Sequence, residues 1–278
     1  MKTKKISALL KHDFNIGFTV NIPKYIISVL VCSFLCVKFY NSIVVSACTS
    51  KGTIMDCYMY LFKGIKVYIP SQDDPFKIPF EWLTIQALIG LLIIQYPTQD
   101  LYSYGMQILI RTKKRISWWL SKCIWNVVTI LIFYILCFII SFAFSAIFGE
   151  LSILPNENVN AFVSGINLTN IKFNLDFYAT VIVLPILTTV AISLLQMTLS
   201  FFLNPIISYL GVTCIMASST YYHSIFLVGN YNMILRNQPI YSEGFGQLII
   251  IIIDLLIIFV SIFVGLVRFK QIDILKKD

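Results

Sequence analysis

Two ionisable residues within long apolar stretches are the first candidates for chemistry. Lys38 lies fourteen residues after Lys24, and Asp254 lies fourteen residues before Arg268. At a helical rise of 1.5 Å per residue, each is about 21 Å from that flanking cation. Charges buried in an apolar medium are usually paired or functional. Equal depth therefore permits a salt bridge between Lys38 and Asp254, with snorkelling of the lysine or a direct substrate or ion role as alternatives.

No other residues match a catalytic or metal-binding motif. His12 and His223 are the only histidines, and the topology derived below places them on opposite sides of a membrane. The sequence has no His-Glu-x-x-His zinc motif, no Gly-x-Ser-x-Gly nucleophile motif and no Gly-x-x-x-x-Gly-Lys phosphate loop. We therefore expect no catalytic residue, no metal and no enzymatic activity of this chain by itself.

The seven cysteines give one candidate disulfide. Five of them lie in or beside apolar stretches, where a cysteine packs as a small polarizable side chain. Cys48 and Cys57 share a polar loop. A disulfide between these two could form if the loop faces an oxidising compartment.

A basic, amphipathic stretch separates two of the apolar runs. Residues 111–115 contain four cations. Polar side chains before and within it recur at spacings of four, four and three residues, at Ser103, Gln107, Arg111 and Lys114. The other faces of such a helix would be apolar. It would therefore lie among lipid headgroups or dock into a pocket on another protein.

The amino-acid composition indicates the environment in which the chain folds. Hydrophobic residues make up 58% of the 278 residues and charged residues only 12%, whereas soluble domains carry roughly 25% charged residues. Several stretches are long enough to cross about 30 Å of hydrocarbon. Because the net charge of +8 gathers in short segments beside them, we expect contacts with membrane lipid and none with nucleic acid.

These stretches predict an all-α integral membrane protein with six transmembrane helices in a single domain, residues 1–278. The expected spans are residues 25–47, 80–98, 117–148, 177–203, 205–222 and 247–267. Helical spacing from Lys5 to Phe18 predicts an amphipathic interfacial helix, ended by a break at Asn21-Ile-Pro23. Residues 223–246 are apolar but interrupted by glycine, asparagine and proline, which predicts a broken element on the outer face.

The distribution of cations orients this layout. Six spans place both termini on one side. Lysine and arginine concentrate near the N-terminus, at residues 111–122 and after Arg268. The positive-inside rule therefore predicts a multi-pass protein of the plasma membrane with both termini and the basic stretch in the cytoplasm. Glu81 and Asp100 lie at span ends, where we expect them to be solvated.

Three stretches, taken with the six-span layout, carry a family resemblance. They are the basic hairpin Leu109-Ile-Arg-Thr-Lys-Lys-Arg-Ile-Ser-Trp-Trp-Leu-Ser-Lys122, the tail Arg268-Phe-Lys-Gln-Ile-Asp-Ile-Leu275 and the segment Gly229-Asn-Tyr-Asn-Met-Ile-Leu-Arg236. The chain resembles an ABC-2-type transporter permease, and the last segment is similar to segments of such permeases from Gram-positive bacteria. The resemblance covers nearly the whole chain in the arrangement of its spans. Its motifs are loose patterns typical of the class and are not diagnostic signatures.

The resemblance implies a membrane subunit whose cytoplasmic coupling helix docks into a separate ATPase. Carried onto this chain, that helix covers about Leu101 to Thr112. Its candidate coupling residues are Leu101, Tyr104, Gln107, Ile108, Arg111 and Lys114. The working unit would contain two permease copies, identical or different, and two ATPase subunits. This chain would hold no cofactor, and the ATPase would bind ATP and Mg.

The resemblance and the apolar composition together indicate export of a hydrophobic or amphipathic substrate, such as a peptide or a lipid-like molecule. The main alternative is a secondary transporter or channel without an ATPase, and an immunity-type membrane protein is the third. Repeats and several buried polar groups would favour the secondary transporter. The sequence has no convincing internal repeat and only two deep charges. Co-purification of a stoichiometric ATPase would distinguish the exporter from its rivals.

Overall fold

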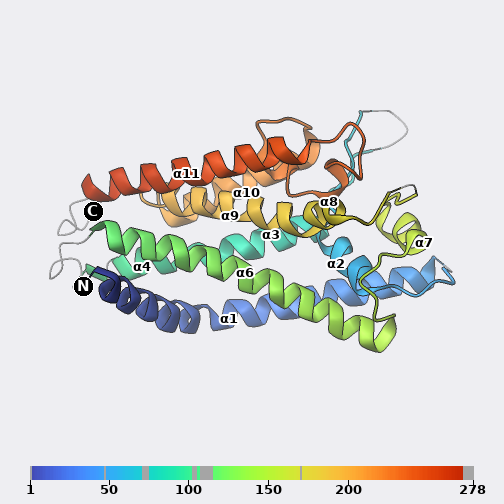
Figure 1. The fold of residues 1–278 in the computed structure, drawn as a ribbon, viewed down its shortest axis with the longest axis horizontal. Helices are drawn as coiled ribbons and strands as arrows, with labels where there is room; N and C mark the ends of the chain where they lie inside the picture. The colour runs from blue at the N-terminus through green and yellow to red at the C-terminus, as the bar shows by residue number, and fades with distance from the viewer. Residues whose placement is uncertain are drawn as a thin grey trace.

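The computed structural model describes residues 2–46, 48–70, 75–101, 105–106, 115–169 and 171–271. Figure 1 shows long helices running lengthwise through a bundle, with both chain termini at the same end. The longer helices are α1 (Lys2–Val45), α3 (Phe80–Ile93), α6 (Arg115–Phe148), α9 (Leu184–Leu199), α10 (Pro205–Tyr221) and α11 (Gln247–Gln271). The shorter pieces are α2 (Ile54–Phe62), α4 (Tyr96–Leu101), α7 (Glu157–Val159), α8 (Leu175–Tyr178), the π turns η1 (Asn160–Ser164) and η2 (Ala179–Val183), and the 3-10 turns η3 (Val228–Asn230) and η4 (Ile234–Arg236).

Five helical stretches among the described residues are long and apolar enough to cross a membrane. They are Leu9–Val45, Phe80–Leu101, Arg115–Phe148, Leu175–Leu199 and Gln247–Lys270. Large apolar side chains point outward from them, as on α11, where Leu248, Ile252 and Phe259 are exposed. The prediction of an all-α, multi-pass membrane protein is confirmed at this level. The 17 residues of α10 span about 25 Å, less than the hydrocarbon thickness.

Helix α1 is continuous across the point where the sequence predicts a break. It runs from Lys2 to Val45 with Pro23 inside it, although an interior proline costs about 3 kcal/mol. Packing offsets this cost, because α1 lies along α6 and α3 and the buried Asn21 side chain donates to the Leu92 carbonyl at 2.8 Å. The expected break at Asn21-Ile-Pro23 is therefore wrong, and residues 5–18 are the first part of one long helix.

The fourth candidate span, Leu175–Leu199, changes from π-helical to α-helical hydrogen bonding just before Pro185. It begins as α8, passes through the π turn η2 and continues as α9. Pro185 has no N–H to donate to an α-helical ladder, which fits a change of winding at this point. Its carbonyl accepts hydrogen bonds from the Tyr134 hydroxyl at 3.1 Å and the Asn232 amide at 2.9 Å. These bonds tie α9 to α6 and to the segment that follows α10.

The end of the bundle opposite the termini contains α2 and an irregular segment before α11 (Figure 1). All nine residues of α2 are buried. The helix starts with a capping box in which the Thr53 and Asp56 side chains each accept from the other's backbone N–H. Residues 223–246 form only the short turns η3 and η4, which confirms that this segment is broken. Its position on an outer face stays a prediction.

Candidate functional site

A fully buried lysine joins three helices near the end of the bundle that carries both termini. Lys122, near the start of α6, has no exposed surface. Its ammonium Nζ lies 2.5 Å from Oδ1 of Asp13 on α1 and 2.7 Å from Oδ2 of Asp100 on α4. We call Asp13, Asp100 and Lys122 the ion triad. The ion triad links α1 to α4 and α6. Asp13 and Lys122 lie 109 residues apart in the sequence.

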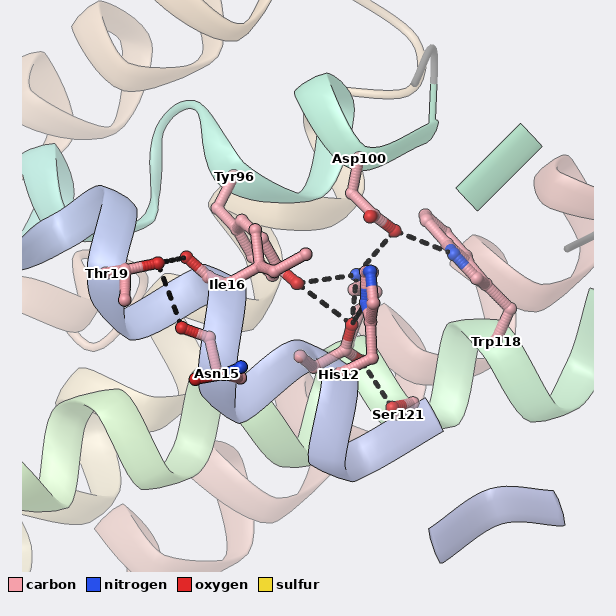
Figure 2. A network of polar contacts seen from close by, with 10 residues as sticks. His12, Asn15, Ile16, Thr19, Tyr96, Asp100, Trp118 and Ser121 are labelled. Carbon is pink, nitrogen blue, oxygen red and sulfur yellow. Dashed lines mark hydrogen bonds and ion pairs between the residues drawn. The ribbon is translucent and has the colours of Figure 1, made fainter. Parts of the chain in front are cut away.

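Neutral donors complete the surroundings of the two carboxylates. The Tyr96 hydroxyl donates to Oδ1 of Asp13 at 3.0 Å, and the Ser121 hydroxyl donates to Oδ2 of the same group. The Trp118 indole N–H donates to Oδ2 of Asp100 at 3.0 Å. Figure 2 shows the side chains of Tyr96, Trp118 and Ser121 turned toward this network. A buried ion pair is tolerated when further hydrogen bonds satisfy its remaining lone pairs, as here.

Aromatic rings enclose the ammonium group. The Nζ atom of Lys122 lies 4.3 Å from the centre of the Tyr96 ring and 5.0 Å from that of Trp118, within the range of cation–π attraction. Trp118, Ser121 and Lys122 are three and four residues apart, so they lie on one face of α6. The sequence of α6 thus delivers an indole, a hydroxyl and a cation to the same point.

The chain just after α4 packs closely against the ion triad. A Cβ atom at Gly105 would lie 2.6 Å from Oδ2 of Asp100 and 2.9 Å from Nε1 of Trp118. Both positions are closer than a real Cβ atom could approach. A larger residue would therefore displace Asp100 or Trp118, and glycine lets the backbone touch the triad.

The structure places one of the predicted coupling residues. Leu101 is buried at the end of α4, directly after Asp100. The other predicted coupling residues, Tyr104, Gln107, Ile108, Arg111 and Lys114, lie outside the described residues. Beyond them, Arg115 opens α6 and donates to the carbonyls of Phe269 at 3.1 Å and Lys270 at 2.6 Å, near the end of α11. The two flanks of residues 102–114 are therefore anchored, one at the ion triad and the other at α11.

The ion triad holds two carboxylates against one ammonium. His12 adjoins it, with Nδ1 at 3.6 Å from Oδ1 of Asp13. Among the described residues, no group of three or more His, Cys, Asp and Glu side chains could hold a metal ion. The interaction here is electrostatic, because one ammonium and two carboxylates hold α1, α4 and α6 together.

The predicted pair of Lys38 and Asp254 does not form. Lys38 makes its ion pair with Glu81 at the start of α3. Oδ2 of Asp254 accepts a hydrogen bond from the Thr188 hydroxyl of α9 at 2.7 Å. The reason is the order of the helices, because α1 packs on α6 and α3 whereas α11 packs mainly on α9. Equal depth in the sequence does not determine which helices are neighbours.

The predicted disulfide between Cys48 and Cys57 is also absent, and both residues are free thiols. Cys57 lies in the buried helix α2, and its Sγ atom is 3.3 Å from Sγ of Cys36 on α1. The prediction was wrong because it placed Cys57 in a polar loop. Residues 54–62 form a helix that packs inside the bundle.

A buried arginine organises the opposite end of the bundle. Arg236 has no exposed surface, and burial lowers the pKa of its guanidinium to about 10. It donates to the backbone carbonyls of Ile65, Lys66, Ser219, Thr220 and Tyr222 and to the amide oxygen of Asn230. The carbonyls of Ser219 and Thr220 belong to the last turn of α10, and that of Tyr222 directly follows it. Arg236 therefore caps α10 and ties it to the chain after α2.

Two more charged groups at this end are shifted by burial. Burial raises the pKa of Asp56 above its ordinary value, while hydrogen bonds from Thr53, Asn156 and Asn160 act in the opposite direction. Burial lowers the pKa of Lys63 to about 8, although Glu81 acts against the shift. The Lys63 ammonium lies 4.2 Å from the centre of the Tyr60 ring. The charges of Asp56 and Arg236 are thus held by neutral hydrogen-bond partners, and the Lys63 ammonium lies over an aromatic ring.

Sequence reasoning missed the ion triad. Asp100 was expected to be solvated and Lys122 to flank a span, yet both are buried, and Glu81 is the partner of Lys38. A signal was present at Asp13, which is three residues after Leu10 and four before Gly17, on the apolar stripe of its helix. A charge on an apolar stripe calls for a buried partner.

Comparison with known proteins identifies a family without a known function. Residues 76–275 match the family described as "Protein of unknown function (DUF2705)". The match includes Asp100 and Lys122 and begins after Asp13. No curated protein and no solved structure matches the chain. Because the matched region covers more than half of the sequence, the chain belongs to the DUF2705 family.

Proposed function

We propose that this chain is the permease subunit of an ATP-driven exporter of the ABC-2 type. A separate ATPase would bind ATP and Mg, and two ATPase copies would work with two permease copies. The proposal rests on the resemblance of the basic hairpin and the tail, and on one structural observation. That observation is the ion triad at the start of the predicted coupling segment.

The proposed topology has six spans, with α10 as the fifth. The α10 helix begins at Pro205 after an Asn204 cap whose side chain accepts from the Ile206 N–H, and it packs on α9 and α3. Its length of about 25 Å suffices if the bilayer thins locally or flanking residues extend it. Both termini lie at the end of the bundle that carries α4 (Figure 1). We assign this end to the cytoplasm of a plasma-membrane protein.

The ion triad supports a mechanical role for the segment after α4. A force on residues 102–114 would reach Asp100 and Leu101 first, and the triad connects Asp100 to Asp13 on α1 and Lys122 on α6. Arg115 passes the same force to the end of α11. Movement of a docked ATPase would then be transmitted to three spans together.

The proposed cargo is hydrophobic or amphipathic, such as a peptide or a lipid-like molecule. The support is the apolar character of the outward faces of the spans, as on α1 and α11. An amphipathic cargo would remain near these faces because its apolar part is stable in the membrane.

The experiment that tests this function is co-purification of the chain with a partner ATPase, followed by an ATP hydrolysis assay in lipid vesicles. Exchange of Arg111 and Lys114 for glutamate should abolish stimulation of the ATPase, because the predicted docking helix would lose its cations. Lys172→Glu changes an exposed cation elsewhere and should leave stimulation unchanged. Full stimulation of the double variant, or a chain that purifies without any ATPase, would contradict the proposal.

A secondary transporter is favoured by one set of observations. Several buried amides form hydrogen bonds between spans, including Asn126 to the Ser193 carbonyl at 3.3 Å and Gln196 to the Gly90 carbonyl at 2.9 Å. Buried polar groups between spans are typical of ion-coupled transporters. Transport by vesicles that contain the purified chain without an ATPase would support this second candidate.

A further inference from the structure

Two adjoining hollows lie along the outward side of α1, toward the end of the bundle opposite the termini. The first has a volume of about 490 Å³ and is bordered by Phe34, Lys38 and Phe162. The second has a volume of about 420 Å³ and is bordered by Lys51. Val37 and Asn41 line both hollows, which makes them neighbours.

The walls of the hollows combine apolar surface with cations. The side chains of Phe34 and Phe162 are 67% and 70% exposed, which is large for aromatic residues and leaves apolar surface at the edge of the first hollow. Lys51 supplies positive charge, Lys38 supplies an ammonium that also pairs with Glu81, and Asn41 supplies amide donors. No carboxylate lines either hollow within the described residues. This composition suits a molecule with an apolar chain and an anionic head.

The depth of Lys38 fits a lipid headgroup. Lys38 lies seven residues before Val45, where the α1 span ends, or about 10 Å along the helix. A lysine can extend its stem over that distance toward the membrane surface. Half of its side-chain surface is exposed although it pairs with Glu81. An ammonium has three donors, so Lys38 can bind Glu81 and a phosphate oxygen at once.

We propose that the two hollows bind one anionic phospholipid of the surrounding bilayer. Its phosphate lies between Lys38 and Lys51, and an acyl chain packs against Phe34, Val37 and Phe162. Opposite charge selects the anionic head, and the apolar walls select an acyl chain over a free anion. This site is independent of the exporter proposal, because it needs neither an ATPase nor a cargo.

The test uses the full chain in nanodiscs that contain equal amounts of phosphatidylglycerol and phosphatidylcholine with the same acyl chains. Native mass spectrometry then measures the lipid that stays bound after gentle extraction. We expect the wild-type chain to retain phosphatidylglycerol preferentially. Near a membrane surface each lysine increases the affinity for anionic lipid about five-fold. Lys38→Gln or Lys51→Gln should therefore reduce this preference about five-fold, and the double variant by more than ten-fold.

Two further variants make the test specific. Val37→Trp keeps both lysines but fills the space that the two hollows share, so it should also release the lipid. Lys172→Gln removes an exposed cation that borders neither hollow and should retain the lipid as the wild type does. Equal retention of the two lipids by the wild type would overturn the proposal. Unchanged retention by the double variant or by Val37→Trp would do so as well.

Discussion

The two ends of the bundle handle buried charge in different ways. At the end with the termini, the Lys122 ammonium is balanced by the carboxylates of Asp13 and Asp100. At the opposite end, the Arg236 guanidinium is held by backbone carbonyls and the Asn230 amide. The first group consists of ions on separate helices, and the second surrounds one ion with dipoles fixed by the backbone.

This difference determines what the loss of a charge would do at each end of the bundle. The charges of the ion triad depend on one another, because loss of the Lys122 cation leaves two buried carboxylates without a partner, whereas loss of one carboxylate leaves a balanced pair. The carbonyls around Arg236 carry no net charge and cannot lose it. Under the proposed function, the end with the termini would be the part that moves and the other end the part that stays fixed.

The largest effect is expected from Lys122→Met. This change leaves two buried carboxylates without a cation, which typically destabilises a protein by about 3 to 5 kcal/mol. The free energy of unfolding in detergent or the thermal midpoint would measure it. A loss below about 1 kcal/mol would show that water or another group already balances the carboxylates.

A matched variant sharpens this prediction. Asp13→Asn, Asp100→Asn and Lys122→Met together remove all three charges, and replacement of a complete buried ion group is often close to neutral. We expect the triple variant to be more stable than Lys122→Met alone. If it is less stable, the triad contributes through its hydrogen bonds more than through its charges.

A smaller effect is expected from Arg236→Met, which removes the donors to the end of α10. Carbonyls that remain buried without a partner cost about 1 to 3 kcal/mol, so we expect a loss of about 3 kcal/mol in the free energy of unfolding. Arg236→Lys keeps the charge but offers fewer donors in a different geometry, and about half of the loss should remain. Equal stability of the lysine variant and the wild type would show that charge alone matters here.

The pH dependence of Lys63 is the smallest of these effects when it is expressed per pH unit. Burial lowers the pKa of this lysine to about 8 from its usual value of 10.5. Between pH 8 and 10.5 the unfolded chain binds more protons at this residue, so its contribution to stability rises with pH, by at most about 1.4 kcal/mol per pH unit. Lys63→Met should lose this rise when unfolding is followed across the range. Lys66→Met, at an exposed position, should keep it.

The sequence was sufficient to predict the fold class and the positions of the long helices. Length and apolar composition determine where a chain can cross a membrane, and the candidate spans after the first start and end close to the expected residues. It was insufficient at Pro23, because packing of α1 against α6 and α3 offset the penalty of an interior proline. The break was predicted from local propensity alone.

The candidate site was harder to predict because the sequence does not show which helices pack against one another. Lys38 and Asp254 were paired by depth, yet they contact Glu81 and Thr188 on other helices. Asp13 could have been noticed, because it interrupts an apolar stripe. Its partner Lys122 lies 109 residues away, and only the packing of α1 on α6 brings the two together.

The most direct test of the central claim, that the ion triad couples the segment after α4 to the membrane helices, is the variant Asp100→Asn. Asparagine can still accept from Trp118, and Asp13 still balances Lys122, so the fold should persist. ATP hydrolysis by the co-purified ATPase is then measured in lipid vesicles. The account predicts that the ATPase stays bound while its stimulation falls about ten-fold or more. Stimulation equal to that of the wild type would contradict the account.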